Sequence, residues 1–148
     1  MEVVDAVAET WGADRVGYRI APTGVFNDMQ DSDPVTTFGY LATKLSEREL
    51  AYIHVVEAFG DQERDEATAQ AVRQAFAGPY IANGGYTPQL ARERIASGMA
   101  DAVAFGMLYI SNPDLRERIE KEAELAQPDQ ATFYGGTEKG YTDYPPLA

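Results

Sequence analysis

The 148-residue sequence contains no cysteine and only one histidine, His54. Without thiols the chain can form neither a disulfide framework nor a thiolate metal site, and a reducing compartment is indicated. Two acidic loops, at residues 28–33 and 61–63, lack the spacing and the glycine of an EF-hand loop. They are typical of solvated faces, so no metal site is expected.

Basic residues are scarce, with 12 Lys and Arg against 24 Asp and Glu, and the formal net charge is -12. Such a surface repels phosphate backbones and anionic lipids, so neither a nucleic acid nor a membrane is expected as a partner. A single phosphate group can still bind locally, because helix N-termini and backbone amides supply positive potential whatever the net charge.

Long apolar runs are also missing, since none approaches the roughly 20 residues that a membrane span needs. The N-terminal segment 1–9 is typical of an acidic amphipathic helix and lacks the basic start of a signal peptide. We therefore expect a cytoplasmic protein. The hydrophobic content of 45% and the charged content of 24% are those of an ordinary globular domain.

The hydrophobic periodicity predicts one helix followed by four strand–helix units. The expected helices cover about 2–11, 35–47, 65–76, 88–97 and 113–125, and the expected strands cover 16–20, 50–57, 80–83 and 102–105. In this organisation the single unit 1–148 has a leading helix at 1–12, four βα units at 14–125 and an irregular tail at 126–148. Strands alternating with helices imply a parallel sheet. The predicted fold class is α/β, a (βα)4 half of a TIM barrel, whose usual size is roughly 250 residues.

Four parallel strands alone present two unpaired edges and an apolar inner face. A second copy, an N-terminal half-barrel or a rearrangement into an open sheet would cover them. Two-fold pairing of two (βα)4 halves would close the barrel, so we expect the chain to self-associate.

Two strand-to-helix junctions carry glycine, the residue that lets a backbone pass close to another group or to a ligand. They are the segments 79–85 and 101–107, and helix-start residues follow each of them. Consecutive βα units ending in glycine are how a (β/α)8 barrel builds a phosphate site from its seventh and eighth loops. The alternative is that these glycines only make tight turns.

The segments of this chain resemble, in order, the C-terminal half of the old yellow enzyme family, the FMN-dependent ene-reductases. Residues 14–22 resemble the family's fifth strand, 50–57 the sixth and 81–86 the seventh. Residues 101–106 with 109–115 resemble the eighth strand and the turn after it, while 132–136 and 140–145 resemble the C-terminal signature. The resemblance implies FMN as cofactor, hydride transfer from NAD(P)H to an activated alkene, and a TIM-barrel fold. It also implies that the family's N-terminal half lies outside this sequence.

That N-terminal half carries the family's substrate-binding pair and its tyrosine proton donor, so no catalytic residue is assigned here. His54 matches a strand residue of the family, and a packed, hydrogen-bonded core histidine is favoured over a catalytic one. We expect the chain to be part of an ene-reductase that is not catalytically complete alone. The alternative is a non-catalytic, isolated or engineered half-barrel that self-associates, and NAD(P)H and alkene would be bound only in a complete barrel.

The resemblance also implies roles for individual residues. Arg19 matches the arginine beside the flavin N1–C2 edge, where a fixed cation stabilises the reduced, anionic flavin. The alternative for Arg19 is a surface ion pair with a carboxylate. Asn83, Gly84 and Gly85 match the loop whose amides approach the FMN phosphate.

Gly106 matches the first residue of the second phosphate turn, and Met107 departs from the family's arginine at the next position. Methionine keeps the backbone N–H but removes the charge-assisted clamp. FMN binding by this chain alone is therefore expected to be weak or absent. Phe133 matches a residue on the dimethylbenzene side of the flavin, and Tyr134 one at the mouth of the substrate pocket. Packing of the tail is the alternative for both.

Overall fold

The computed structural model describes residues 1–60, 62–134 and 136–147. The chain divides into two compact units, Met1–Ala104 and Phe105–Ala148, which are described separately. Asp61, in one of the acidic loops, and Gly135, in the C-terminal signature, lie outside the described residues.

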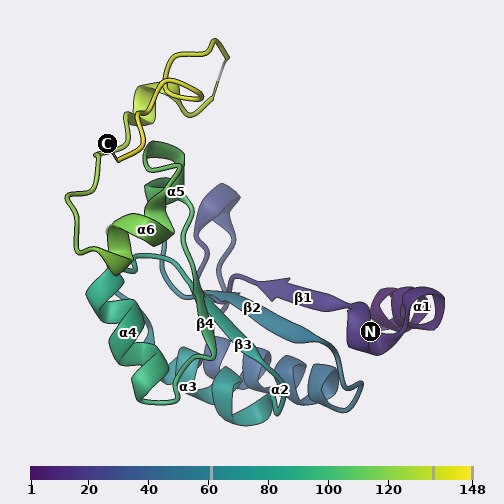
Figure 1. The fold of residues 1–148 in the computed structure, drawn as a ribbon. Coiled ribbons are helices and arrows are strands. Elements are labelled where there is room, and N and C mark those ends of the chain that lie inside the picture. Colours follow the sequence, from purple (N-terminus) through teal and green to yellow (C-terminus); the bar gives the residue numbers. More distant parts are fainter. Residues whose placement is uncertain (61, 135, 148) are drawn as a thin grey trace. The chain divides into compact units, whose positions relative to one another are not determined.

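The first unit is an alternation of strands and helices around a parallel sheet (Figure 1). Its elements are α1 (Glu2–Trp11), η1 (Ala13–Arg15), β1 (Gly17–Ile20), η2 (Phe26–Asp28), α2 (Pro34–Ser46), β2 (Tyr52–Val56), α3 (Glu66–Ala75), β3 (Tyr80–Asn83), α4 (Pro88–Ala96) and β4 (Ala102–Ala104). The strands pair in parallel in the order β1-β2-β3-β4. This confirms the predicted α/β class and the four strands, each to within two residues at either end.

The two faces of the sheet differ because side chains alternate along each strand. Ile53 and Val55 of β2, with Tyr80 and Ala82 of β3, are at most 1% exposed. The helices α2, α3 and α4 lie on one side of this sheet (Figure 1), and their side chains Leu45 and Val72 are fully buried. The opposite set of strand positions includes Arg19, His54 and Asn83. The core therefore lies between the sheet and the helices, and the candidate polar residues lie on the other face.

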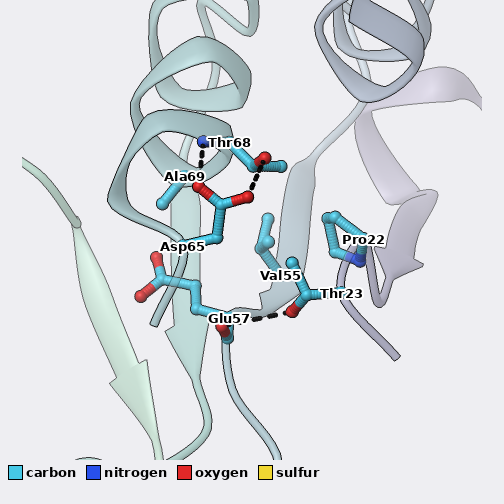
Figure 2. A pocket seen from close by; sticks show the side chains of 7 residues that line it. All are labelled: Pro22, Thr23, Val55, Glu57, Asp65, Thr68 and Ala69. Carbon is cyan, nitrogen blue, oxygen red and sulfur yellow. Dashed lines mark hydrogen bonds between the residues drawn. The ribbon is translucent and has the colours of Figure 1, made fainter. Parts of the chain in front are cut away.

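The helix starts follow from capping residues that the sequence supplies. The side chain of Asp33 accepts the N–H of Thr36, that of Asp65 accepts the N–H of Thr68, and that of Thr87 accepts the N–H of Leu90. The hydroxyl and backbone N–H of Thr68 both donate to Asp65, and they hold the pKa of this carboxyl below its usual value. Figure 2 shows this carboxylate turned toward Thr68 at the start of α3.

The second unit differs from the prediction. It contains α5 (Met107–Ser111), α6 (Leu115–Glu120) and η3 (Gln130–Thr132). The predicted helix at 113–125 is wrong in extent, and the helix at Met107–Ser111 was not predicted. Asn112 precedes Pro113, takes a non-helical backbone conformation and separates α5 from α6. After α6, Glu122 has a left-handed φ of 52°, which ends the helix.

Side-chain contacts to backbone hold the second unit together. The Asn112 amide donates to Leu108 O and Ala126 O, and its oxygen accepts the Ala126 N–H. Arg118 donates to Glu124 O and, in the tail, to Pro145 O. In the described part of the chain, no helix is long and apolar enough to cross a membrane. The division of the chain into a leading helix, βα units and tail stays a prediction.

Candidate functional site

Two residues of the predicted cofactor site meet at the carboxyl edge of the sheet. Arg19, one residue before the end of β1, donates through Nη2 to Asn83 Oδ1 at 3.5 Å. Asn83 ends β3, and its Nδ2 donates to Ala104 O at 2.8 Å. Among the described residues Arg19 makes no ion pair with a carboxylate, so its contact is with the amide and not with the acidic surface. Its guanidinium is exposed beside the strand ends.

His54 is the neighbour of Arg19 in the sheet. Its Nε2 is buried and has no hydrogen-bond partner within the described residues. The expectation of a packed, hydrogen-bonded core histidine is therefore not met: His54 is half-buried on the face opposite the helices, and its Nε2 lacks the expected hydrogen bond. Burial, and then the positive charge of Arg19, lower the pKa of His54, so the neutral ring is favoured.

The loop after β3 has a conformation that its glycines make possible. Gly84 and Gly85 have φ of 96° and 63°, in the left-handed region. A Cβ on Gly84 would overlap the carbonyl oxygen of Ala58, whereas a Cβ on Gly85 would meet nothing nearer than 3.9 Å. Gly84 thus allows close packing of two loops, and the backbone at Gly85 stays open. Helix α4 begins three residues later, capped by Thr87.

A buried cluster of ionisable groups lies beside this loop, and the sequence analysis did not identify it. Glu57 directly follows β2 and is only 5% exposed. Its carboxylate accepts the hydroxyls of Tyr80 at 2.7 Å and Tyr86 at 2.5 Å. Arg64 Nε lies 2.8 Å from Glu57 Oε2, and Arg94 Nη2 lies 3.5 Å from the same oxygen. A carboxylate at the end of the apolar run 50–56 was the available signal, because a charge at the end of a buried strand needs a partner.

The cluster keeps its tyrosines protonated. Burial raises the pKa of Tyr86 to about 12, helped by its hydrogen bond to Glu57. Burial and the charge of Glu57 also raise the pKa of Tyr80. Both hydroxyls are therefore donors near neutral pH, and Glu57 is their acceptor.

A small hollow lies on the other side of Glu57, between the end of β2, the loop after β1 and the start of α3 (Figure 2). Its lining residues are Pro22, Thr23, Val55, Glu57, Asp65, Thr68 and Ala69. The empty space within it, open solvent included, is about 160 Å³, so the hollow is smaller than the roughly 300 Å³ at which small-molecule sites begin. The Thr23 hydroxyl crosses it to donate to Glu57 O at 3.4 Å. This hollow therefore serves packing and is not a cofactor pocket.

The remaining candidates belong to the second unit. Gly106 is the N-cap of α5, with no atom within 4 Å of the position of an added Cβ. Met107 is the first residue of α5, and its side chain is 47% exposed. Phe133, directly after η3, is half-buried, and Tyr134 is 91% exposed. The structure thus brings Arg19 and Asn83 into contact in the first unit. Gly84 and Gly85 directly follow Asn83 in the chain.

We expect Gly84→Ala to destabilise the fold much more than Gly98→Ala. Both glycines have a left-handed φ, which costs other residues roughly 1–2 kcal/mol. Only at Gly84 would the added methyl also overlap backbone, that of Ala58. Chemical denaturation should show about 1 kcal/mol lost in Gly98→Ala and at least twice that in Gly84→Ala. Equal losses would show that the Ala58 contact yields without cost.

We also expect the stability of the chain to fall below about pH 6.5 because of His54. The folded-state pKa of His54 is lowered, so on acidification the unfolded chain takes up this proton before the folded chain does. The stabilisation is present above the ordinary histidine pKa of about 6.5 and is lost as the pH falls through the folded value. The slope is at most about 1.4 kcal/mol per pH unit for one proton.

His54→Gln removes the chain's only histidine and should flatten the pH profile. The measurement is the free energy of unfolding between about pH 7.5 and 5.5, above the range where ordinary carboxylates titrate. Parallel profiles for the two proteins would mean that His54 has the same pKa folded and unfolded.

Comparison with known proteins identifies a family. The model of the NADH:flavin oxidoreductase / NADH oxidase family matches residues 1–126. Flavin oxidoreductase hxnT of Emericella nidulans is 39% identical, over 98% of this chain and 44% of its own length. The structure of morphinone reductase in complex with tetrahydroNAD is 46% identical with a TM-score of 0.90, over 99% of this chain and 40% of that one. The structure of the old yellow enzyme from Trypanosoma cruzi is 35% identical with a TM-score of 0.94, over 99% of this chain and 39% of that one.

These matches confirm the resemblance stated from the sequence and the partial TIM barrel that it implied. The chain spans less than half the length of these relatives. Since the family model covers residues 1–126 and the parallel sheet follows the solved structures, the chain belongs to the NADH:flavin oxidoreductase / NADH oxidase family.

Proposed function

We propose that this chain supplies part of the FMN site of an NAD(P)H-dependent ene-reductase. The observation that carries the proposal is the carboxyl edge of β1 and β3, where Arg19 and Asn83 meet next to the open Gly84–Gly85 backbone. Carboxyl ends of parallel strands are where barrel enzymes build their sites. Family membership supports the same cofactor.

The residues of the loop fit a phosphate group. The backbone at Gly85 is open on its Cβ side, and a capped helix begins just beyond it, so amide donors and the positive end of α4 are available to an anion. Asn83, Gly84 and Gly85 would hold the FMN phosphate. Arg19 would lie at the flavin edge that gains negative charge on hydride uptake. When bound, FMN supplies hydride transfer from NAD(P)H to an activated alkene.

For residues of the second unit, the roles that we propose rest on family membership alone. Gly106 and the backbone N–H of Met107 would form the second phosphate turn, with Phe133 beside the flavin and Tyr134 at the mouth of the substrate pocket. Since Met107 has no cation, we propose that this chain alone binds FMN weakly or not at all. Substrate binding and proton donation would depend on residues of a complete barrel.

A second role, as a self-associating half-barrel, is favoured by the sheet itself. Strands β1 and β4 are at its two edges, and within Met1–Ala104 the helices cover one face only (Figure 1). Unpaired edges and an uncovered face favour association. We propose that a second copy, or an N-terminal half-barrel, is the partner.

Met107→Arg should raise the affinity for FMN by about ten- to a hundredfold. A hydrogen bond to a charged group contributes roughly 1.5–3 kcal/mol, which corresponds to that change in the dissociation constant. Quenching of FMN fluorescence on titration measures it, and Met107→Gln, which adds a polar but uncharged side chain, is the control. Alkene turnover with NADPH should stay negligible in all three proteins. If arginine gives no gain in affinity over glutamine, residue 107 does not contribute to phosphate binding as proposed.

Light scattering tests the self-association. We expect an oligomer at micromolar concentration, weakened by Ile81→Lys, because position 81 pairs with His54 on the uncovered face. Ile95→Lys is the matched control, since Ile95 is 47% exposed on α4 and its replacement places the same charge on the helical side. A monomeric wild-type chain, or equal weakening by both variants, contradicts this mode of pairing.

A further inference from the structure

The Gly84–Gly85 peptide presents its carbonyl oxygen and its N–H on opposite sides, and the carbonyl is held by the half-buried side chain of Arg64. Arg64 Nη2 donates to Gly84 O at 2.9 Å. In a planar trans peptide the carbonyl and the following N–H point in opposite directions. Because the Gly84 carbonyl points to Arg64, the Gly85 N–H must point away from it. Arg64 therefore determines which way this amide donor faces.

The orientation of this peptide needs to be fixed because the peptide lies between two glycines. Glycine adopts left-handed and right-handed backbone conformations with similar ease, so a Gly–Gly peptide can flip at small cost unless something holds it. The close approach of Ala58 restrains Gly84 on one side. The hydrogen bond from Arg64 restrains the carbonyl itself.

Arg64 is in turn held by its surroundings. It is 12% exposed, and its Nε lies 2.8 Å from Glu57 Oε2, in an ion pair that is not a hydrogen bond through Nε. Its guanidinium lies over the ring of Tyr86 at 4.3 Å. Glu57 is fixed by the two tyrosine hydroxyls. Three separate contacts thus leave the arginine fork a single orientation.

We propose that Glu57 and Arg64 are positioning residues that orient the Gly85 N–H toward the phosphate site. Glu57 anchors the guanidinium, the guanidinium holds the Gly84 carbonyl, and the amide on the other side of the peptide faces the ligand. The choice of phosphate as the ligand rests on the proposed function, whereas the orientation of the peptide does not. Neither residue needs to touch the ligand.

The test compares Arg64→Gln with Arg73→Gln in the 148-residue chain. Arg73 is the matched control, because it also donates to glycine carbonyls, those of Gly98 and Gly78, and pairs with a carboxylate, Asp101. The first readout is the ¹H–¹⁵N signal of the Gly85 amide and its hydrogen-exchange rate. We expect both to change in Arg64→Gln and to stay as in wild type in Arg73→Gln.

The second readout is binding of FMN, and of inorganic phosphate as the minimal probe. Loss of one oriented donor to an anion should weaken binding about tenfold in Arg64→Gln, with little change in Arg73→Gln. Arg64→Lys keeps the positive charge but not the forked guanidinium, so its affinity should lie between those of Arg64→Gln and the wild-type chain. If circular dichroism shows that Arg64→Gln does not fold, both readouts are measured on Arg64→Lys and Glu57→Gln instead.

The two readouts separate the two proposals. An unchanged Gly85 amide in the folded Arg64 variants overturns the positioning role, whether or not FMN binds. A changed Gly85 amide in a chain that binds neither FMN nor phosphate supports the positioning role and contradicts the proposed function. A changed amide together with weakened binding supports both.

Discussion

The buried carboxylate of Glu57 is the constraint on which the carboxyl edge of the first unit depends. At 5% exposure it must be satisfied by donors, and those donors come from β3, from the loop before α3, from the loop after β3 and from α4. Removing one partner of such a group leaves an uncompensated buried charge, which is strongly destabilising. One side chain thereby joins four segments whose contacting residues lie 7 to 37 positions further along the chain.

This constraint makes the loop geometry a consequence of the sheet. Glu57 stands where β2 ends, so the Arg64 guanidinium is fixed relative to the strands and not to a mobile loop. Arg94 extends the network, since it pairs with Glu66 at the start of α3 and donates to the Tyr86 hydroxyl. The glycine loop is then positioned by elements of the scaffold, as precise binding sites require.

Local signals predicted most of the fold, and long-range pairings could not be read from the sequence. Thr87-Pro88 marked the start of α4, and the apolar run at 50–57 marked β2, because capping and burial act within a few residues. The missed helix at Met107–Ser111 follows a glycine and has no side-chain cap, so it lacked a local signal. The partners of Glu57 lie 7 to 37 positions away, and no periodicity reports such contacts. For the site, Arg19 and Asn83 were placed by resemblance, while Arg64 required the structure.

The charge balance of the cluster bears on how an anion could be held here. Arg64 and Arg94 are each paired with Glu57 and Glu66, so the four groups carry no net charge when all are ionised. The chain as a whole is strongly acidic. Long-range attraction therefore contributes little at this loop, and an anion held here as proposed would depend on local donors such as the amides of the loop.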